Sequence, residues 1–188
     1  MIVHRQKQTL YKVLALVFFF FYTNISSAQS HKVALSLTGG IVQDGFGGAL
    51  AVDYKVNEFD YIQFNALGIF AKLEQQNIDI PVHSYSFNPG YFFDVIRNNS
   101  RKFGLALGAG GIIGYESINN GNKDLGNDLQ LEIETNTIIY GAYVGLDADI
   151  FISPVIAIHI KANELYHVNS EAGEFTPYVG VGIKLIIK

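Results

Sequence analysis

Large apolar residues alternate with small or polar ones along several stretches of this chain, and this period of two constrains the fold more than any other feature. The clearest stretch is residues 45–55. Its large apolar side chains share one parity and are Phe46, Leu50, Val52 and Tyr54. The other parity holds Gly47, Ala49, Ala51, Asp53 and Lys55. Because successive side chains of a strand point to opposite sides of the sheet, the pattern predicts strands with one apolar face.

The same alternation recurs through the chain. It is present in residues 102–116, 137–152 and 175–187, where glycine, alanine, tyrosine or aspartate opposes large aliphatic residues. Four further segments of similar character complete a set of eight, namely residues 32–42, 59–72, 80–96 and 155–168. Most are longer than strands of soluble proteins and match the roughly nine to eleven tilted residues that cross a bilayer.

No stretch after residue 28 approaches the length of apolar sequence that a membrane-spanning helix needs. A membrane protein without such helices must close its sheet into a barrel, because every backbone polar group has to be paired within the bilayer. The predicted connections also alternate, with tight turns after the second, fourth and sixth segments and longer ones after the third, fifth and seventh, as in outer-membrane barrels. The fold class predicted is therefore all-β, an antiparallel up-and-down β-barrel of about eight strands and of the outer-membrane type.

The composition of the two faces distinguishes a membrane barrel from a soluble one. A soluble barrel places its large apolar residues inside, whereas here small residues and carboxylates oppose the aliphatic ones. This favours apolar side chains toward lipid and small or polar ones toward the lumen. Eight strands enclose a lumen just wide enough for side chains to fill, so we expect a plugged interior and no porin-like channel.

The first 28 residues have the pattern of a secretory signal peptide. Three basic residues precede an unbroken apolar run over residues 13–22, and small residues end the segment at Ala28. We expect cleavage there, which leaves residues 29–188 as a single barrel domain with a long external loop at about residues 117–136. Export and the predicted fold together place the protein in the outer membrane of a Gram-negative bacterium.

Charge and cysteine content exclude several classes of function. After residue 28 the chain has ten Lys and Arg against seventeen Asp and Glu, a net charge of −7. An acidic protein has no electrostatic attraction for DNA or RNA, so direct nucleic-acid binding is not expected. The chain has no cysteine, which removes disulfides, thiol nucleophiles and cysteine–zinc sites. We expect no cofactor and no catalytic or metal site.

One polar constellation stands out on the predicted lumen face. Asp147 and Asp149 share that face of one strand, and His159 and Lys161 share it on the next strand. The set resembles the polar site of a barrel enzyme, but paired charges that plug a narrow lumen explain it more simply. A weaker grouping is Glu164, His167 and Ser170, near the end of the same strand.

Other motifs carry no chemistry that we can support. The glycines around residue 110 lie within a strand and lack the helix and the Lys-Ser/Thr pair of a phosphate-binding loop. The loop at residues 117–136 is rich in Asn, Asp and Gly but lacks the spacing of a calcium-binding loop. We interpret it as an exposed loop, and as the first place to expect contacts with partners.

Three segments carry a resemblance to a known family. They are residues 90–121 (GYFFDVIRNNSRKFGLALGAGGIIGYESINNG), residues 138–153 (IIYGAYVGLDADIFIS) and residues 180–188 (GVGIKLIIK). They resemble the TraO conjugal transfer proteins encoded by conjugative transposons of Bacteroidetes. The resemblance implies a component of the apparatus that moves DNA between cells, and it brings no catalytic or ligand-binding residues with it.

The leading hypothesis is a non-enzymatic outer-membrane barrel of a conjugation system, with outer-membrane lipid and other proteins of that machinery as its partners. A generic surface or adhesion barrel is the alternative, with the loop at residues 117–136 as its contact surface. A barrel enzyme that acts on envelope lipid is a further alternative, and it would use Asp147, Asp149, His159 and Lys161.

Overall fold

The computed structural model describes residues 33–75, 78–97, 102–126 and 129–187, and they form a closed antiparallel β-barrel of eight strands. This confirms the predicted fold class. The barrel strands are β1 (Val33–Val42), β2 (Gly45–Lys55), β3 (Asp60–Gln75), β4 (Ile78–Arg97), β5 (Phe103–Ile118), β8 (Asn136–Phe151), β9 (Ile156–His167) and β10 (Phe175–Ile187). The predicted signal peptide lies outside the described residues, so its cleavage stays a prediction.

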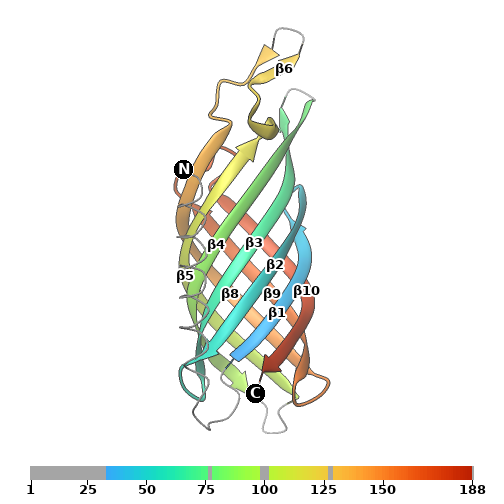
Figure 1. Ribbon diagram of the computed structural model, residues 1–188, viewed down its shortest axis with the longest axis vertical. Helices are drawn as coiled ribbons and strands as arrows, with labels where there is room; N and C mark the ends of the chain where they lie inside the picture. Colours follow the sequence, from blue (N-terminus) through green and yellow to red (C-terminus); the bar gives the residue numbers. More distant parts are fainter. Residues whose placement is uncertain (1–32, 76–77, 98–101, 127–128, 188) are drawn as a thin grey trace, which may run out of the picture. The chain divides into compact units, whose positions relative to one another are not determined.

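Each barrel strand pairs with its neighbours in the chain, and the first strand pairs with the last (Figure 1). Strands β1 and β10 are antiparallel from Val33 opposite Ile187 to Val42 opposite Tyr178. This pairing closes the ladder, so neither β1 nor β10 is left as an open edge. Among the described residues there is no helix of the length and apolarity that crossing a membrane requires.

Two connections differ from the sequence expectation. Strands β3 and β4 keep pairing as far as Gln75 opposite Ile78, so the connection after the third strand is short where a longer one was predicted. The loop at residues 117–136 is partly structured. It contains the 3₁₀ turn η1 (Asn119–Gly121) and a small hairpin of β6 (Asp124–Gly126) and β7 (Leu129–Gln130), which extends beyond the barrel (Figure 1).

A small apolar core explains why this loop is ordered. Leu131 follows β7 and is buried against Ile80, Val82 and Ile118, which project from the extended ends of β4 and β5. The alternation of apolar residues in β4 and β5 therefore continues beyond the section of the barrel in which all eight strands are paired. Asn120, Asn122 and Asp124 of this loop are exposed, as predicted, but Leu131 is not. Burial of Leu131 offsets part of the entropy lost on ordering the segment.

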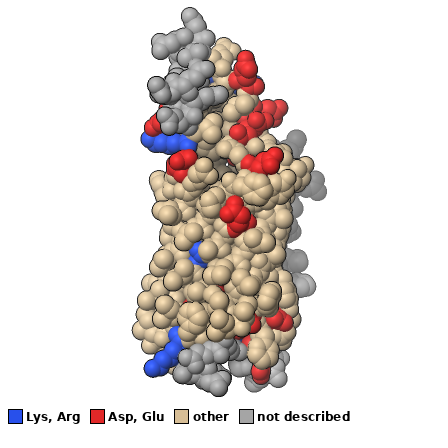
Figure 2. Space-filling model, turned by 180° about the vertical axis from the view of Figure 1, so that it is seen from behind, with Lys and Arg blue, Asp and Glu red and all other residues tan. Residues whose placement is uncertain are grey.

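The predicted assignment of the two faces is confirmed. Large apolar side chains point outward, and Leu37, Ile138 and Val181 are 64%, 67% and 56% exposed. The opposite parity is buried and includes polar residues such as Asp53, Gln63 and Asp147. Figure 2 shows the result on one side of the molecule: most charged side chains lie toward the two ends, and the surface between them is almost free of charge.

Pairs of glycines and aromatic rings fill the lumen. The ring of Phe92 occupies the space where Gly108 and Gly145 have no side chain. Tyr143 lies in the same way over Gly90 and Gly110. Phe92 also stacks on Tyr61 with ring centroids 5.3 Å apart, which fixes its position between the strands. Glycine at these inward positions is thus a packing requirement in a narrow barrel.

Adding one methyl group to this packing should be costly. We expect Gly108→Ala to lower the free energy of unfolding by about 1–3 kcal/mol, because the new methyl group would overlap the ring of Phe92. The measurement is urea unfolding of the barrel refolded in lipid vesicles. Gly39→Ala is the matched control, since a methyl group on that outward glycine meets no atom within 4 Å. Equal midpoints for the two variants would contradict this account of the lumen.

Candidate functional site

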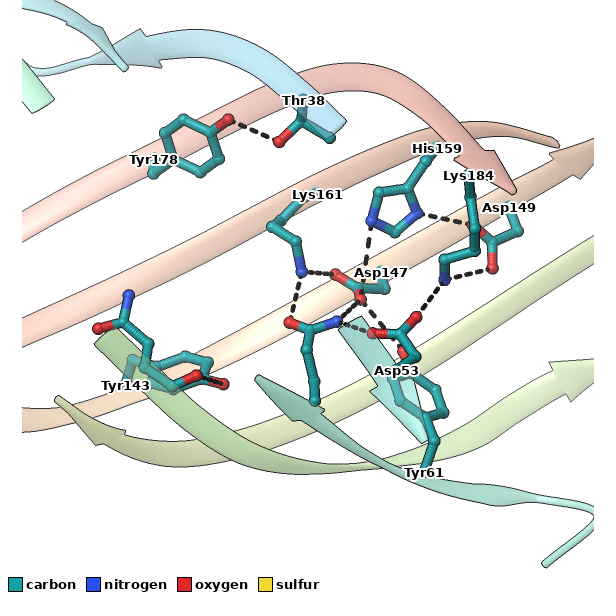
Figure 3. A network of polar contacts seen from close by, with 12 residues as sticks. Thr38, Asp53, Tyr61, Tyr143, Asp147, Asp149, His159, Lys161, Tyr178 and Lys184 are labelled. Carbon is teal, nitrogen blue, oxygen red and sulfur yellow. Dashed lines mark hydrogen bonds and ion pairs between the residues drawn. The ribbon is translucent and has the colours of Figure 1, made fainter. Parts of the chain in front are cut away.

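A cluster of charged side chains fills one part of the lumen, and we call it the lumen cluster (Figure 3). Strands from opposite sides of the barrel contribute to it. Its members are Asp53 on β2, Tyr61 and Gln63 on β3, Asp147 and Asp149 on β8, His159 and Lys161 on β9, and Lys184 on β10.

Asp147 is the centre of the lumen cluster. Its Oδ1 accepts a hydrogen bond of 2.7 Å from Nζ of Lys161, and both side chains are almost fully buried. Its Oδ2 accepts from Nε2 of Gln63 at 2.8 Å and from the hydroxyl of Tyr61 at 3.1 Å. Lys161 in turn donates to Oε1 of Gln63 at 2.7 Å. This carboxylate therefore joins the adjacent strands β8 and β9 to β3, which lies elsewhere around the barrel.

A second carboxylate, Asp149, holds the other half of the lumen cluster. Nδ1 of His159 lies 2.6 Å from its Oδ1, and Nζ of Lys184 donates to its Oδ2 at 2.9 Å. Lys184 also forms an ion pair of 3.0 Å with Asp53, across the pairing that closes the barrel. The side chain of Asp149 is 18% exposed, so this half of the cluster is the one that reaches solvent.

The charges of the lumen cluster nearly balance. Three carboxylates face the ammonium groups of Lys161 and Lys184 and the imidazole of His159, whose Nε2 is 3.8 Å from Asp147. The two ammonium groups also lie over aromatic faces, Lys161 over Phe92 at 5.4 Å and Lys184 over Tyr61 at 5.5 Å. Burial of so many charges is tolerated because each is paired and hydrogen-bonded.

The structure brings together the four residues that the sequence singled out, Asp147, Asp149, His159 and Lys161. Register explains this directly, since Asp147 is opposite Lys161 and Asp149 is opposite His159 on the neighbouring strand. Sequence reasoning missed Asp53, Tyr61, Gln63 and Lys184 as members. The parity of Asp53 and Lys184 marks them as inward. Pairing of β10 with β9 places Lys184 near Asp149, whereas only closure of the barrel brings Asp53 to Lys184.

Among the described residues, the lumen cluster contains no serine or threonine. The nearest serine by register is Ser36, opposite Lys184, and its buried Oγ makes no hydrogen bond. A serine nucleophile needs a base within hydrogen-bond reach, and the one hydroxyl of the cluster, that of Tyr61, instead donates to Asp147. What the arrangement does is tie strands across the lumen through charge-assisted hydrogen bonds.

The other grouping noted in the sequence does not assemble. Glu164 is exposed on the outer surface, whereas His167 is buried on the lumen side. Ser170 instead donates to the buried carboxylate of Glu116 at 2.7 Å, and the backbone N–H of Glu171 donates to the same group at 3.1 Å. These bonds hold the connection between β9 and β10 to β5. Within the described ranges, no group of three or more potential metal ligands is present.

The fold and its two faces define the class of protein. The N-terminal β-barrel domain of Pseudomonas aeruginosa OprF is similar with 8% identity and a TM-score of 0.54, over 82% of this chain and 96% of that one. Neisserial surface protein A is similar with 11% identity and a TM-score of 0.55, over 82% and 95%. The molecule is a barrel of the outer-membrane type.

The sequence identifies the family within that class. Residues 28–187 match the family described as conjugative transposon protein TraO. The chain therefore belongs to the TraO family. No curated protein matches it.

The central ion pair of the lumen cluster offers a test of its structural role. We expect Lys161→Met to lower the free energy of unfolding by about 3–5 kcal/mol, because it leaves the buried carboxylate of Asp147 without its closest cation. The double variant Asp147→Leu/Lys161→Met should be less destabilised than Lys161→Met alone, since no charge is then left unpaired. Urea unfolding in lipid vesicles measures both.

A control for this test lies on the barrel's exposed extension. Lys72 and Asp79 form an ion pair of 2.7 Å with both side chains more than half exposed. Lys72→Met should leave the unfolding midpoint unchanged, because solvent screens an exposed pair. A double variant less stable than the single Lys161→Met would contradict the proposed role of the buried pair.

Proposed function

We propose that this protein is a non-enzymatic outer-membrane subunit of the apparatus that transfers a conjugative transposon between cells. The observation that carries the proposal is the family match, which spans nearly the whole of the barrel domain. The fold supplies a reason for its location, because an apolar outer wall with a polar interior is suited to a bilayer and unsuited to water.

The filled interior of the barrel favours a structural role over transport of DNA. Rings such as Phe92, Tyr143 and Tyr178 and the charges of the lumen cluster fill the described barrel, so a DNA strand has no path through it. The net negative charge after residue 28 also opposes direct contact with nucleic acid. The protein would thus serve the apparatus through its outer wall and its ends, in contact with lipid and with other proteins of the machinery.

The location is tested by fractionation. We expect the protein in the outer-membrane fraction, with a gel mobility that changes when the sample is heated, because a closed barrel resists unfolding in detergent until it is boiled. Recovery from the soluble periplasm with a heat-independent mobility would contradict an outer-membrane barrel.

The role in transfer is tested by deletion of the gene in a donor strain. We expect the transfer frequency of the transposon to fall by at least tenfold, and a plasmid copy of the full chain to restore it. Growth and detergent sensitivity of the same strains are the controls. Unchanged transfer together with new detergent sensitivity would favour a general envelope role.

A further inference from the structure

One acidic residue interrupts the apolar outer wall of the barrel. The other outward residues of β9 are all apolar, namely Ile156, Ile158, Ile160, Ala162 and Tyr166, whereas Glu164 is exposed in the same row. Outward apolar residues precede and follow it along β9. Tyr166, two residues further along β9, packs against Phe175 with ring centroids 5.0 Å apart, and this aromatic pair lies nearer the end of the strand.

The neighbours of Glu164 on both sides are apolar and exposed. It is opposite Val144 on β8, which is 61% exposed, and opposite Pro177 on β10. None of the described side chains forms an ion pair or a hydrogen bond with its carboxylate. A carboxylate facing lipid without a partner is unfavourable, and the penalty grows with its depth in the bilayer.

The outer surface beside Glu164 is formed mainly by small side chains. The outward residues of β5 and β8 next to it are small, with Ala109 opposite Val144 and Gly111 opposite Ala142. A methyl group on Gly111 would meet only one atom, at 3.9 Å. Small outward residues let another backbone approach the wall closely, as they do between membrane-spanning segments.

We propose that this surface, defined by Ala109, Gly111, Ala142, Val144 and Glu164, binds a membrane-embedded segment of another protein that carries a Lys or Arg side chain opposite Glu164. The inference rests on the proposed outer-membrane role. Charge complementarity selects the occupant, because a cation from a partner would compensate the one charge in this part of the wall. A second copy of this chain is not the occupant, since the one exposed lysine on the described barrel strands, Lys72, is already paired with Asp79 at 2.7 Å.

The test separates binding from stability. Glu164→Leu should leave the urea midpoint of the isolated barrel in lipid vesicles unchanged or higher, because it removes a charge from a lipid-facing wall. In donor cells with equal amounts of barrel in the outer membrane, the same variant should lower transfer at least tenfold. Glu164→Asp should keep most of the transfer. Glu174→Leu is the matched control, an exposed glutamate in the connection after β9, and it should have no effect.

Crosslinking identifies the occupant. A photoreactive residue at position 144 should join the barrel to one protein of the transfer machinery, whereas the same residue at position 50, on β2, should not. Glu164→Lys should abolish this product, and exchange of the partner's Lys or Arg for Glu should restore it.

Three results would overturn the inference. In the first, the Glu164→Leu variant transfers at the wild-type frequency. In the second, the crosslinked segment contains no Lys or Arg. In the third, the residue at position 144 crosslinks to a second copy of the chain or to no protein. If Glu164→Leu transfers normally while deletion of the gene abolishes transfer, the docking surface is wrong and the proposed function stands. If deletion itself has no effect, the proposed function fails and the docking surface fails with it.

Discussion

Closure of the backbone ladder between β1 and β10 is the constraint on which the rest of this structure depends. Ten residue pairs join the two strands, and they convert a sheet with two open edges into a wall with an inside and an outside. Once that distinction exists, the period of two along each strand acquires a physical meaning. Large aliphatic side chains lie on the outer surface, and small, aromatic or charged ones lie in the lumen.

The narrowness of the lumen then determines which residues can occupy it. Glycines such as Gly108 and Gly110 are needed because the rings of Phe92 and Tyr143 take the space their side chains would use. The charged residues face the same restriction, and they meet it by pairing. Asp147 and Asp149 bind Lys161, His159 and Lys184 on the nearby strands β9 and β10. Gln63 and Asp53 then join this network to β3 and β2, which are distant in sequence.

The outer wall carries the part of the molecule most relevant to partners. A lumen that is filled leaves the wall and the two ends of the barrel for interaction with other molecules. The end that bears η1 and the β6–β7 hairpin is ordered by its own small core around Leu131. Glu164 differs from the charges in the lumen, because its carboxylate has no partner in the described structure. This difference is why we assign it to a contact outside the chain.

The amino-acid sequence by itself determined the strands, their number and their two faces, because alternation is a local property that any eleven residues such as 45–55 display. It also indicated that Asp147, Asp149, His159 and Lys161 share the lumen, because their two strands are neighbours in the chain. Only the tertiary structure decided that Asp53 joins them through Lys184, since β2 and β10 approach through closure of the barrel. The burial of Leu131 and the small side chains beside Glu164 were likewise decided there, because both depend on residues that are distant in sequence.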